Sequence, residues 1–524
     1  MATIFQAFLC GLLAYTSRWE MENLQTAFSS NTMLGFLTGI IFGNPLTGLV
    51  VGGTMDLLYL GLVEIGGATP PRPHIATIIT SAIVTELGQP PAVAIALSFP
   101  IAILAAQLIN AAFILNTGYM HYIDSLIAKG KFRTAEIVHL TGGLTTEFMF
   151  QGLAAFLGVW LGSGPIAAIY NAVPPAFWGS MITAAQLVIC VGLAALLRTI
   201  WKPEVIAFYL IGFGLAAFLH LPMVSMALLI GAVAIYIFTT KKVETTGSPE
   251  KVEEKPKERR LSSSEFFKIF LRSLFLQNTF SSERMQASGY WYSIFPALKK
   301  YYSGDELIEN SKAHLEFYNT NPVTSQPILG INIAMIEEGV ATPELQKNLK
   351  AGLMGPLAGV GDAIWWFSIS TIITVLGASM ALQGNYIAPF FIWGCGIVFI
   401  LGAKYVLLRY GYTAGLSLLK TAQVTGGIER YLDLFTIVGA SMVGAVTGTW
   451  IGLYTPIEFV QGGVVIFKIQ TALDYIMPQL LSLIGTVSAV YLLRRGVSLF
   501  KLMIAYMLGG IVLGYLGLLA AVPF

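Results

Sequence analysis

Charged side chains are scarce in this sequence: aspartate, glutamate, lysine and arginine together make up 11% of its 524 residues. A soluble domain carries about 25%, so this chain cannot cover a water-facing surface with charge. Hydrophobic residues make up 55%, and apolar runs of about 20 residues, the length that crosses a bilayer, recur along the chain. The composition predicts an all-α, polytopic membrane protein. The net charge of +2 says little about partners, and no nucleic-acid partner is expected.

Cysteine and histidine are also rare. Cys10, Cys190 and Cys395 are isolated within apolar stretches, which predicts small core residues rather than a disulfide or a metal site. The five histidines show no metal-ligand spacing. We therefore expect no metal and no cofactor. The N-terminus has no basic region followed by a small-residue cleavage site, so no cleaved signal peptide is expected.

Motifs for nucleotide and hydrolytic chemistry are missing as well. The glycine-rich stretch GLMGPLAGVGDAIWW (residues 352–366) does not complete GxGxxG or GxxxxGK[ST], and the chain has no HExxH and no GxSxG. The protein is therefore not expected to hydrolyse ATP by itself. Any energy for transport has to come from an ion gradient or from a partner.

One charged, proline-containing segment, residues 241–264, interrupts the hydrophobic pattern and predicts a solvated linker on the cytoplasmic side. It separates a membrane domain, residues 1–240, from a second half. In that half, residues 265–350 predict amphipathic helices lying on or dipping into the membrane, and residues 351–524 predict membrane spans. Gly247-Ser248 leaves open whether the joint between the halves is natural or engineered.

Several apolar spans contain glycine or proline, notably GNPLTG (residues 43–48) and GGATPPRP (residues 66–73). Interrupted helices at membrane depth are tolerated only where they are buried or line a cavity, and in transporters they often build the substrate site. We expect a third break in residues 352–366, forming a hinge or cavity edge from Gly355, Pro356, Gly359 and Gly361. Ionisable residues beside such breaks favour a pathway for a polar solute.

The second half carries ERMQASGYWYSIFPALKK (residues 283–300), HLEFYNTNPVTSQPILG (residues 314–330) and the glycine-rich stretch, in that order. These motifs resemble the IID subunit of the mannose family of the bacterial phosphoenolpyruvate-dependent phosphotransferase system (PTS). The first half resembles the IIC subunit through GNPLTGLVVGGTMDLLYLGLVEIGGATPP (residues 43–71). The resemblance covers nearly the whole chain and implies IIC followed by IID in one polypeptide.

The resemblance implies a multi-pass sugar permease of the bacterial cell membrane. Its two related helical units would have opposite orientations, assemble as a homotrimer and move sugar by an elevator-like motion. The phosphoryl donor would be a phosphohistidine on a soluble IIB protein, charged in turn by IIA, so this chain would be only the membrane part of a phosphotransferase. Members of this family also serve as receptors for some bacteriocins and for phage DNA entry.

Within the matching motifs, polar side chains suited to sugar hydroxyls form the candidate substrate site, because an unpaired buried polar group costs about 1–3 kcal/mol. They are Asp56, Glu64, Arg72, His74, Gln277, Glu283, Arg284, Gln286, His314, Asn319, Asn321 and Asp362. Glu64 or Asp56 would accept the proton of the reacting hydroxyl as general base, and an arginine would steady the transferring phosphoryl group.

Simpler roles stay open for several of these residues. Glu283 and Arg284 suit an ion pair that locks a helix, and His314 suits a structural hydrogen bond. Asp362 suits an N-cap for a helix that begins at Ala363. Trp365-Trp366 suits an interfacial belt or a stacking face for sugar.

Three positions depart from the family pattern: Arg72 replaces a common aspartate, Ser281 a common asparagine and Ala363 a common proline. Because arginine pairs with carboxylates, Arg72 raises the alternative of an acidic or otherwise modified sugar. The other interpretation is that Arg72 pairs with Glu64 and that the substrate is an ordinary hexose or N-acetylhexosamine. Two further functions stay open: an ion-coupled or passive sugar transporter that needs no phosphorylation, and a surface receptor or scaffold.

Overall fold

The computed structural model describes most of the chain. The described residues are 2–59, 72–88, 91–162, 174–199, 205–221, 225–226, 229–233, 236, 260–425, 437, 440–441, 443–449, 451–461 and 464–521. Almost all of the regular structure is helical, as the composition predicts. The expected linker, residues 241–264, lies largely outside the described residues.

The first half forms a series of helices that begins at a capping box, in which the Thr3 side chain and Gln6 satisfy each other's backbone donors. The elements are α1 (Ile4–Glu22), α2 (Asn31–Ile41), α3 (Pro45–Leu58), α4 (Pro73–Leu87), α5 (Pro91–Ala128), α6 (Phe132–Glu147), the π-helical turn η1 (Phe148–Gly152), α7 (Leu153–Leu161), α9 (Pro175–Thr199) and α10 (Val205–Leu219).

The second half also opens on a capping box, made by Ser262 and Glu265. Its helices are α12 (Ser263–Ser273), α13 (Ala287–Tyr301), α14 (Gly304–Ala313), α15 (Ser325–Glu337), α16 (Pro343–Gly361), η3 (Asp362–Ser370), α17 (Thr371–Leu382), α18 (Ala388–Gly396), η4 (Ile397–Leu401), α19 (Gly402–Thr425), α21 (Ile469–Ile476), α22 (Leu480–Arg494) and α23 (Leu499–Tyr515). Its short strands are β1 (Leu453–Tyr454), β2 (Glu458–Gln461), β3 (Val464–Lys468) and β4 (Ala520–Ala521). β1 pairs with β4 and β2 with β3, both antiparallel.

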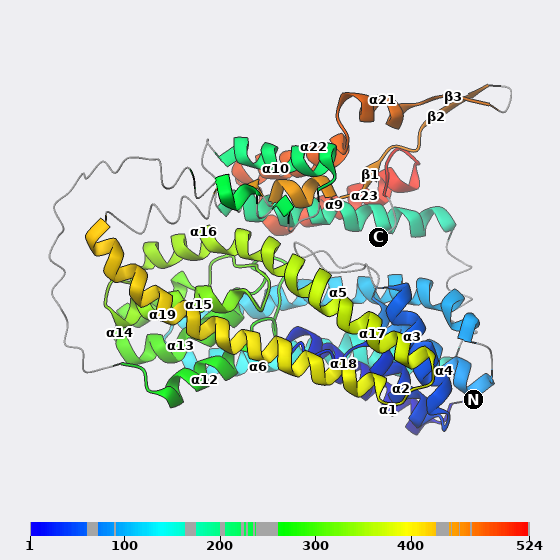
Figure 1. Cartoon of the computed structure of the whole chain (residues 1–524), viewed down its shortest axis with the longest axis horizontal. Helices are drawn as coiled ribbons and strands as arrows, with labels where there is room; N and C mark the ends of the chain where they lie inside the picture. Colours follow the sequence, from blue (N-terminus) through cyan, green and yellow to red (C-terminus); the bar gives the residue numbers. More distant parts are fainter. Residues whose placement is uncertain are drawn as a thin grey trace.

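The helices form two layers (Figure 1). The larger layer combines α1 to α7 with α12 to α19, and the smaller one combines α9 and α10 with α22, α23 and the short strands. Within the smaller layer, a Cβ on Gly510 would lie 2.4 Å from Ala184 Cα, and one on Gly212 would lie 1.7 Å from Ser441 O. Each layer is thus built from corresponding parts of both halves, with helices of different halves in close contact.

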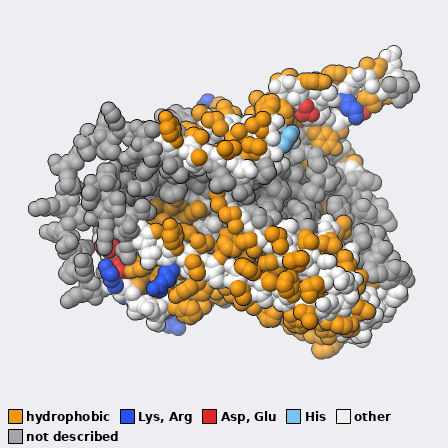
Figure 2. Space-filling model, in the orientation of Figure 1, with side chains coloured by type: hydrophobic (Ala, Val, Ile, Leu, Met, Phe, Trp, Pro, Cys, Tyr) orange, Lys and Arg blue, Asp and Glu red, His pale blue; other side chains and the backbone are white. Residues whose placement is uncertain are grey.

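Among the described residues, four helical stretches are long and apolar enough to cross a membrane: Ile101–Ala128, Phe132–Leu161, Leu357–Leu382 and Ala388–Gly415. A fifth results if Ile469–Ile476 and Leu480–Arg494, which are bent by 71°, form one span. Hydrophobic side chains cover much of the face of the larger layer (Figure 2). Ile372, Val398 and Val406 are each more than half exposed, as expected for side chains that face lipid.

The predicted helix break at GNPLTG is confirmed. α2 ends at Ile41, and α3 begins at Pro45 with Asn44 as its N-cap. The two helices pack against each other as a hairpin, in which a Cβ on Gly35 would lie 2.3 Å from Gly48 O. Only glycine permits this approach, which explains Gly48 and Gly52 of the first-half motif. The break predicted at residues 66–73 falls mostly outside the described residues.

The break predicted in residues 352–366 is wrong. The chain runs without interruption from α16 through the π-helical segment η3 into α17. Pro356 and the glycines therefore lie inside a helix and do not form a loop. The reason for one of the glycines is packing: a Cβ on Gly361 would lie 2.4 Å from Thr324 Oγ1 and 2.5 Å from Asn321 Cβ.

A second expectation also needs correction. α13 was expected at the membrane surface, yet its side chains from Ala287 to Phe295 are all buried. Tyr290 and Trp291 belong to the main hydrophobic core. Of the segments expected to be amphipathic, α12 does show one apolar face, with Phe266, Ile269 and Phe270 buried and Phe267 and Leu271 exposed.

Candidate functional site

A cavity of about 300 Å³ lies between the two halves. From the first half it is lined by the α1–α2 connection, α3 and the start of α4, and from the second by residues 277–286 and 319–322 together with α16, η3 and α17. Leu193 of α9 and Val446 bring the smaller layer to its wall. Its volume is at the lower end of the range of about 300–1,000 Å³ for small-molecule sites.

The first-half wall contains a short connection, residues 23–30, held in an unusual conformation. Gln25 and Ala27 have φ values of 61° and 63°, which side chains with a Cβ rarely adopt. Glu20 stabilises the connection by accepting hydrogen bonds from the backbone N–H groups of Thr26 and Ser29. Backbone strain of this kind persists only where the surroundings impose it.

Most of those surroundings belong to the second half. The buried Lys404 donates from Nζ to the carbonyl oxygens of Asn23 and Leu24, at 3.2 and 3.3 Å. Trp393 Nε1 donates to Thr26 Oγ1 at 3.1 Å. The shape of the first-half wall therefore depends on helices of the second half.

The second-half wall shows the reverse dependence. Its residues 277–286 include Met285 at a φ of 55°. Asn116 Nδ2 donates to Phe280 O at 2.9 Å, and the Asn278 amide donates to the carbonyl oxygens of His139 and Leu140. Each half thus fixes the cavity wall of the other.

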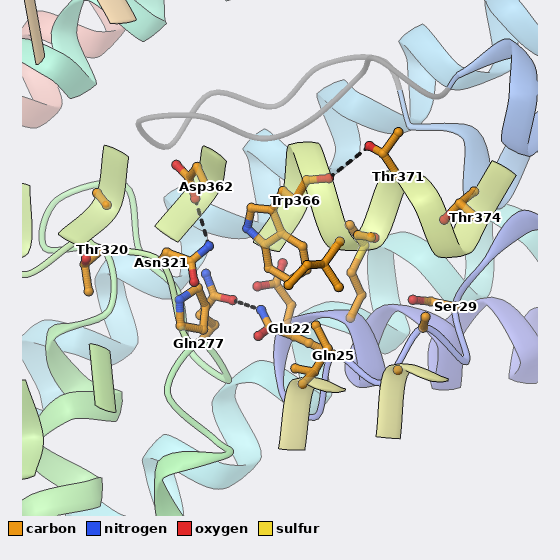
Figure 3. A pocket seen from close by; sticks show the side chains of 18 of the residues that line it. Glu22, Gln25, Ser29, Gln277, Thr320, Asn321, Asp362, Trp366, Thr371 and Thr374 are labelled. Carbon is orange, nitrogen blue, oxygen red and sulfur yellow. Dashed lines mark hydrogen bonds between the residues drawn. The ribbon is translucent and has the colours of Figure 1, made fainter. Parts of the chain in front are cut away.

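The two walls meet at a pair of glutamines, as Figure 3 shows. Gln25 Nε2 donates to Gln277 Oε1 at 2.8 Å. The local sequences are alike: LQTAFSS at residues 24–30 and LQNTFSS at residues 276–282. The chain therefore contains an internal repeat whose second residue, in both copies, lies at the contact between the halves.

Two aspartates line the cavity, one from each half, and both accept a hydrogen bond from an asparagine. Asn31 Nδ2 donates to Asp56 Oδ1 at 2.9 Å, and Asn321 Nδ2 donates to Asp362 Oδ1 at 2.9 Å. Asn31 begins α2, and Asn321 precedes α15, where its Oδ1 accepts from the backbone N–H of Val323. Asp362 is not the N-cap of a helix at Ala363, because helical structure continues on both sides of it.

η3 gives the cavity an aromatic wall. Trp366 of this π-helical segment lies beside the glutamine pair in Figure 3. π-Helical turns are rare and frequently mark functional sites. Trp366 therefore faces the cavity, which favours the stacking interpretation over an interfacial belt for this one tryptophan.

A compensated charge cluster lies at the first-half side of the cavity. Arg18 is paired with Glu22, and its Nε lies 3.3 Å from Glu147 Oε2; all three side chains are buried. Arg72 is also buried, within electrostatic reach of Glu147, and its Nη1 lies 3.6 Å from Met21 Sδ. Two guanidinium groups are thus balanced by two carboxylates of the protein.

Two polar atoms of the cavity wall lack a hydrogen-bond partner in the described part of the chain: Gln25 Oε1 and Thr320 Oγ1. Their residues are only 7% and 4% exposed. A buried polar atom without a partner costs about 1–3 kcal/mol. A ligand that brings hydroxyl groups would remove this cost.

The structure brings together most of the residues expected from the sequence. Those that line the cavity are Asp56, Arg72, His74, Gln277, Gln286, Asn319, Asn321, Gly355, Gly359 and Asp362. Gln286 exchanges two hydrogen bonds with the Thr320 backbone, at 2.7 and 3.2 Å. Glu64 lies outside the described residues.

Three expected residues lie away from the cavity lining. Arg284 Nη1 is 2.8 Å from Asp124 Oδ2 of α5, an ion pair between the halves, and Glu283 Oε2 lies 2.8 Å from His121 Nε2, a second contact between them. His314 is fully buried against Gln346. Burial lowers the pKa of His314 and keeps its ring neutral, which fits the structural role.

Sequence reasoning missed several cavity residues, in the first half, in the connection before α15, and in η3 and α17. They are Met21, Glu22, Gln25, Ser29, Ser30, Asn31, Thr320, Ser370, Thr371 and Thr374. The internal repeat was the available signal, since it places Gln25 in the position that Gln277 occupies in the second half. A helical membrane protein whose two halves enclose a cavity lined in part by polar side chains belongs to the class of solute carriers.

Comparison with known proteins identifies the family. Residues 4–236 match the family "PTS system sorbose-specific iic component", and residues 260–519 match "PTS system mannose/fructose/sorbose family IID component". The chain therefore belongs to the mannose/fructose/sorbose family of the PTS and carries IIC followed by IID in one polypeptide. It is a multi-pass permease component of the bacterial cell membrane.

Individual relatives agree with this assignment. The fructose permease IID component of Bacillus subtilis (strain 168) is 37% identical over 270 residues, which cover 49% of this chain and 97% of that protein. The mannose-specific EIID component of Escherichia coli (strain K12) is 31% identical and covers 48% of this chain and 93% of that protein. The mannose-specific EIIC component of the same E. coli strain is 24% identical, and the match covers 38% of this chain and 76% of that protein.

Among solved structures, a chain of the cryo-EM structure of the mannose transporter ManYZ in complex with microcin E492 is similar to this protein. It is 31% identical, with a TM-score of 0.48, and the match covers 50% of this chain and 99% of that chain.

Proposed function

We propose that the cavity between the IIC and IID halves binds a neutral monosaccharide, which the permease carries across the membrane for phosphorylation by a soluble IIB phosphohistidine protein. The observation that carries the proposal is the pair of unpartnered buried atoms, Gln25 Oε1 and Thr320 Oγ1, in a cavity of about 300 Å³. A pyranose or furanose ring supplies the hydroxyl groups they need, and its apolar face suits Trp366.

The charge cluster supports a neutral substrate over an acidic one. Arg72 shares its surroundings with Glu147, which lies within its electrostatic reach, and Arg18 is engaged by Glu22. The positive charge of Arg72 is therefore already balanced, at least in part, by the protein carboxylate of Glu147. An acidic sugar would bring a further negative charge to a wall that also holds Asp56 and Asp362.

The relatives are named for fructose, mannose and sorbose, and all three are neutral hexoses. This supports a hexose for the present chain. The partners in the proposal are the soluble IIA and IIB proteins, with three copies of the chain assembled in the membrane and an elevator-like motion of one part of each copy.

The proposal is tested by uptake into membrane vesicles, with and without phosphoenolpyruvate and the soluble PTS proteins. Fructose, mannose, sorbose, an N-acetylhexosamine and gluconate are offered in turn. We expect one neutral sugar to enter as its phosphate only when the complete relay is present. Entry of unmodified sugar regardless of the relay would favour the ion-coupled or passive transporter, and uptake of gluconate alone would restore the acidic-sugar interpretation of Arg72.

A further inference from the structure

The cavity is built from like residues of the two halves. Gln25 corresponds to Gln277 in the internal repeat, and these two side chains contact each other. The Asn31–Asp56 pair of the first half resembles the Asn321–Asp362 pair of the second, each with a donor–acceptor distance of 2.9 Å. Asn31 begins α2 and Asp56 lies in α3, whereas Asn321 lies in the connection before α15 and Asp362 begins η3.

The two aspartates differ in how many hydrogen bonds their carboxylates accept from the described part of the chain. Asp56 Oδ1 accepts from the backbone N–H and the amide of Asn31, at 3.0 and 2.9 Å. Asp56 Oδ2 accepts from the backbone N–H and the hydroxyl of Thr32, at 2.8 and 2.6 Å. An ionised carboxylate has about four acceptor sites. All four are filled, so Asp56 holds the start of α2, where a negative charge also suits the helix dipole.

The Asp362 carboxylate, in contrast, has most of its acceptor sites unfilled within the described part of the chain. Within the described part of the chain, the Asn321 amide supplies the one hydrogen bond that Asp362 accepts, and it reaches only Oδ1. Figure 3 shows the Asp362 carboxylate above Asn321 at the cavity wall, with Thr320 next to it. Asn321 itself is fixed, because its Oδ1 accepts from Val323 N at 2.9 Å. Asp362 is therefore held in place with acceptor capacity to spare.

Thr320 provides an independent sign that this part of the wall meets a ligand. Its hydroxyl is buried and without a partner, although its backbone N–H and carbonyl are both bonded to Gln286. The residue is thus held by its backbone, while its hydroxyl makes no hydrogen bond with the described part of the chain. A hydroxyl that can both donate and accept, beside a carboxylate that accepts, suits a ligand with adjacent hydroxyl groups.

We propose that the two aspartates have different roles: Asp362 is the carboxylate that binds the sugar, with Thr320 on the same wall of the cavity, and Asp56 is a structural cap. This inference rests on the proposed sugar-binding function of the cavity and names the wall that recognises the ligand. A ring hydroxyl donates to Asp362 Oδ2, and Asn321 is the positioning residue that holds the carboxylate. The first half contributes Gln25 and one wall of the cavity, and the second half contributes the Asp362 carboxylate that accepts the hydrogen bond from the sugar.

The test compares two matched substitutions, Asp362→Asn and Asp56→Asn, in the full chain purified in detergent. Binding of fructose, mannose and sorbose is measured by titration calorimetry, and folding by thermal unfolding. We expect Asp362→Asn to weaken sugar binding by about tenfold or more, as for loss of one hydrogen bond to a charged group, with little change in the unfolding temperature. Asp56→Asn is expected to lower the unfolding temperature by more than Asp362→Asn does, because protein groups fill all four acceptor sites of its carboxylate.

A second measurement uses the unaltered chain, so that it does not depend on any variant folding. A hydrophobic carbodiimide labels accessible carboxyl groups, and mass spectrometry locates the label. Bound sugar is expected to protect Asp362 from labelling. Equal labelling of Asp362 with and without sugar, or wild-type affinity in Asp362→Asn, would overturn the proposal.

The outcomes separate this inference from the proposed function. If the wild-type chain binds none of the three sugars, the proposed function fails. If the wild-type chain binds sugar and Asp56→Asn, folded at the temperature of the assay, loses affinity while Asp362→Asn keeps it, only the assignment of the carboxylates fails.

Discussion

Gln25 and Gln277, which are 252 positions apart, share a hydrogen bond of 2.8 Å at the wall of the cavity. Each stands second in its copy of the repeated sequence LQxxFSS, and each lies in a wall that the opposite half holds in place. The halves are therefore connected through equivalent residues. A ligand in the cavity would therefore contact a wall whose shape depends on both halves.

The first prediction concerns this glutamine pair. Gln25→Ala and Gln277→Ala each remove one side of the contact and a polar group from the cavity. We expect either substitution to raise the KM for sugar uptake by about three- to tenfold, the cost of about 1 kcal/mol for one net hydrogen bond. Gln383→Ala, at an exposed position after α17, is the control and should leave KM unchanged. A normal KM in both cavity variants would remove the pair from the site.

The second prediction concerns the lysine that holds the first-half wall. Lys404→Met leaves the carbonyl oxygens of Asn23 and Leu24 without their shared donor, and the residues that follow, Gln25 and Ala27, lose support for their unusual φ angles. We expect the free energy of unfolding to fall by about 1–3 kcal/mol and uptake to be largely lost.

Lys347→Met is the matched control, because Lys347 makes an exposed ion pair with Glu316. Such pairs contribute about 0–1 kcal/mol. Thermal unfolding and vesicle uptake are measured on both variants. If they behave alike, Lys404 has no special role in the cavity.

The third prediction concerns the close contact that positions Asn321. In Gly361→Ala the new Cβ would lie 2.4 Å from Thr324 Oγ1 and 2.5 Å from Asn321 Cβ, so α16 or the asparagine has to shift. Overpacking of this kind costs about 1–3 kcal/mol. We expect a lower unfolding temperature and weaker sugar binding, since Asn321 holds Asp362.

Gly402→Ala, in α19, has no atom within 4 Å of the new Cβ. It should be neutral or stabilise the protein by up to about 1 kcal/mol, because alanine favours a helix over glycine. A stabilising effect of Gly361→Ala would contradict the assigned contact.

The fourth prediction concerns pH. The hydrogen bond from Lys300 and the capping contacts of Ser262 lower the pKa of Glu265 to about 2, from its ordinary value of 4.5. Because the folded pKa lies below the unfolded one, the stabilisation is present above about pH 4.5 and is lost as the pH falls toward about 2. Glu265→Gln should remove this part of the pH dependence.

The measurement is thermal unfolding of wild type, Glu265→Gln and the exposed-site control Glu309→Gln at several pH values. The difference between wild type and Glu265→Gln should be largest near neutral pH and shrink in acid. A difference that grows as the pH falls would show that the pKa of Glu265 is not lowered in the folded protein.

Residue motifs predicted the family and many of the cavity residues, but not the path of the chain through the glycine-rich stretch. Glycine and proline in residues 352–366 predicted a loop, and the structure contains a helix. Local propensity is a weak prior that packing overrides. Here Gly361 serves the contact with Asn321 and Thr324, which no local pattern reveals. Likewise, α13 is rich in aromatic residues and was expected at the membrane surface, yet it is enclosed by protein.

The sequence by itself determined that this protein is a helical membrane protein in two halves, that α2 and α3 are separated at GNPLTG, and that its motifs are those of a PTS permease. These properties follow from composition and from neighbouring residues. Only the tertiary structure decided that Gln25 meets Gln277, that Asp56 has all its acceptor sites filled, and that Asp362 has acceptor capacity left. Those relationships join residues far apart in the chain, so they arise only when the two halves pack against each other.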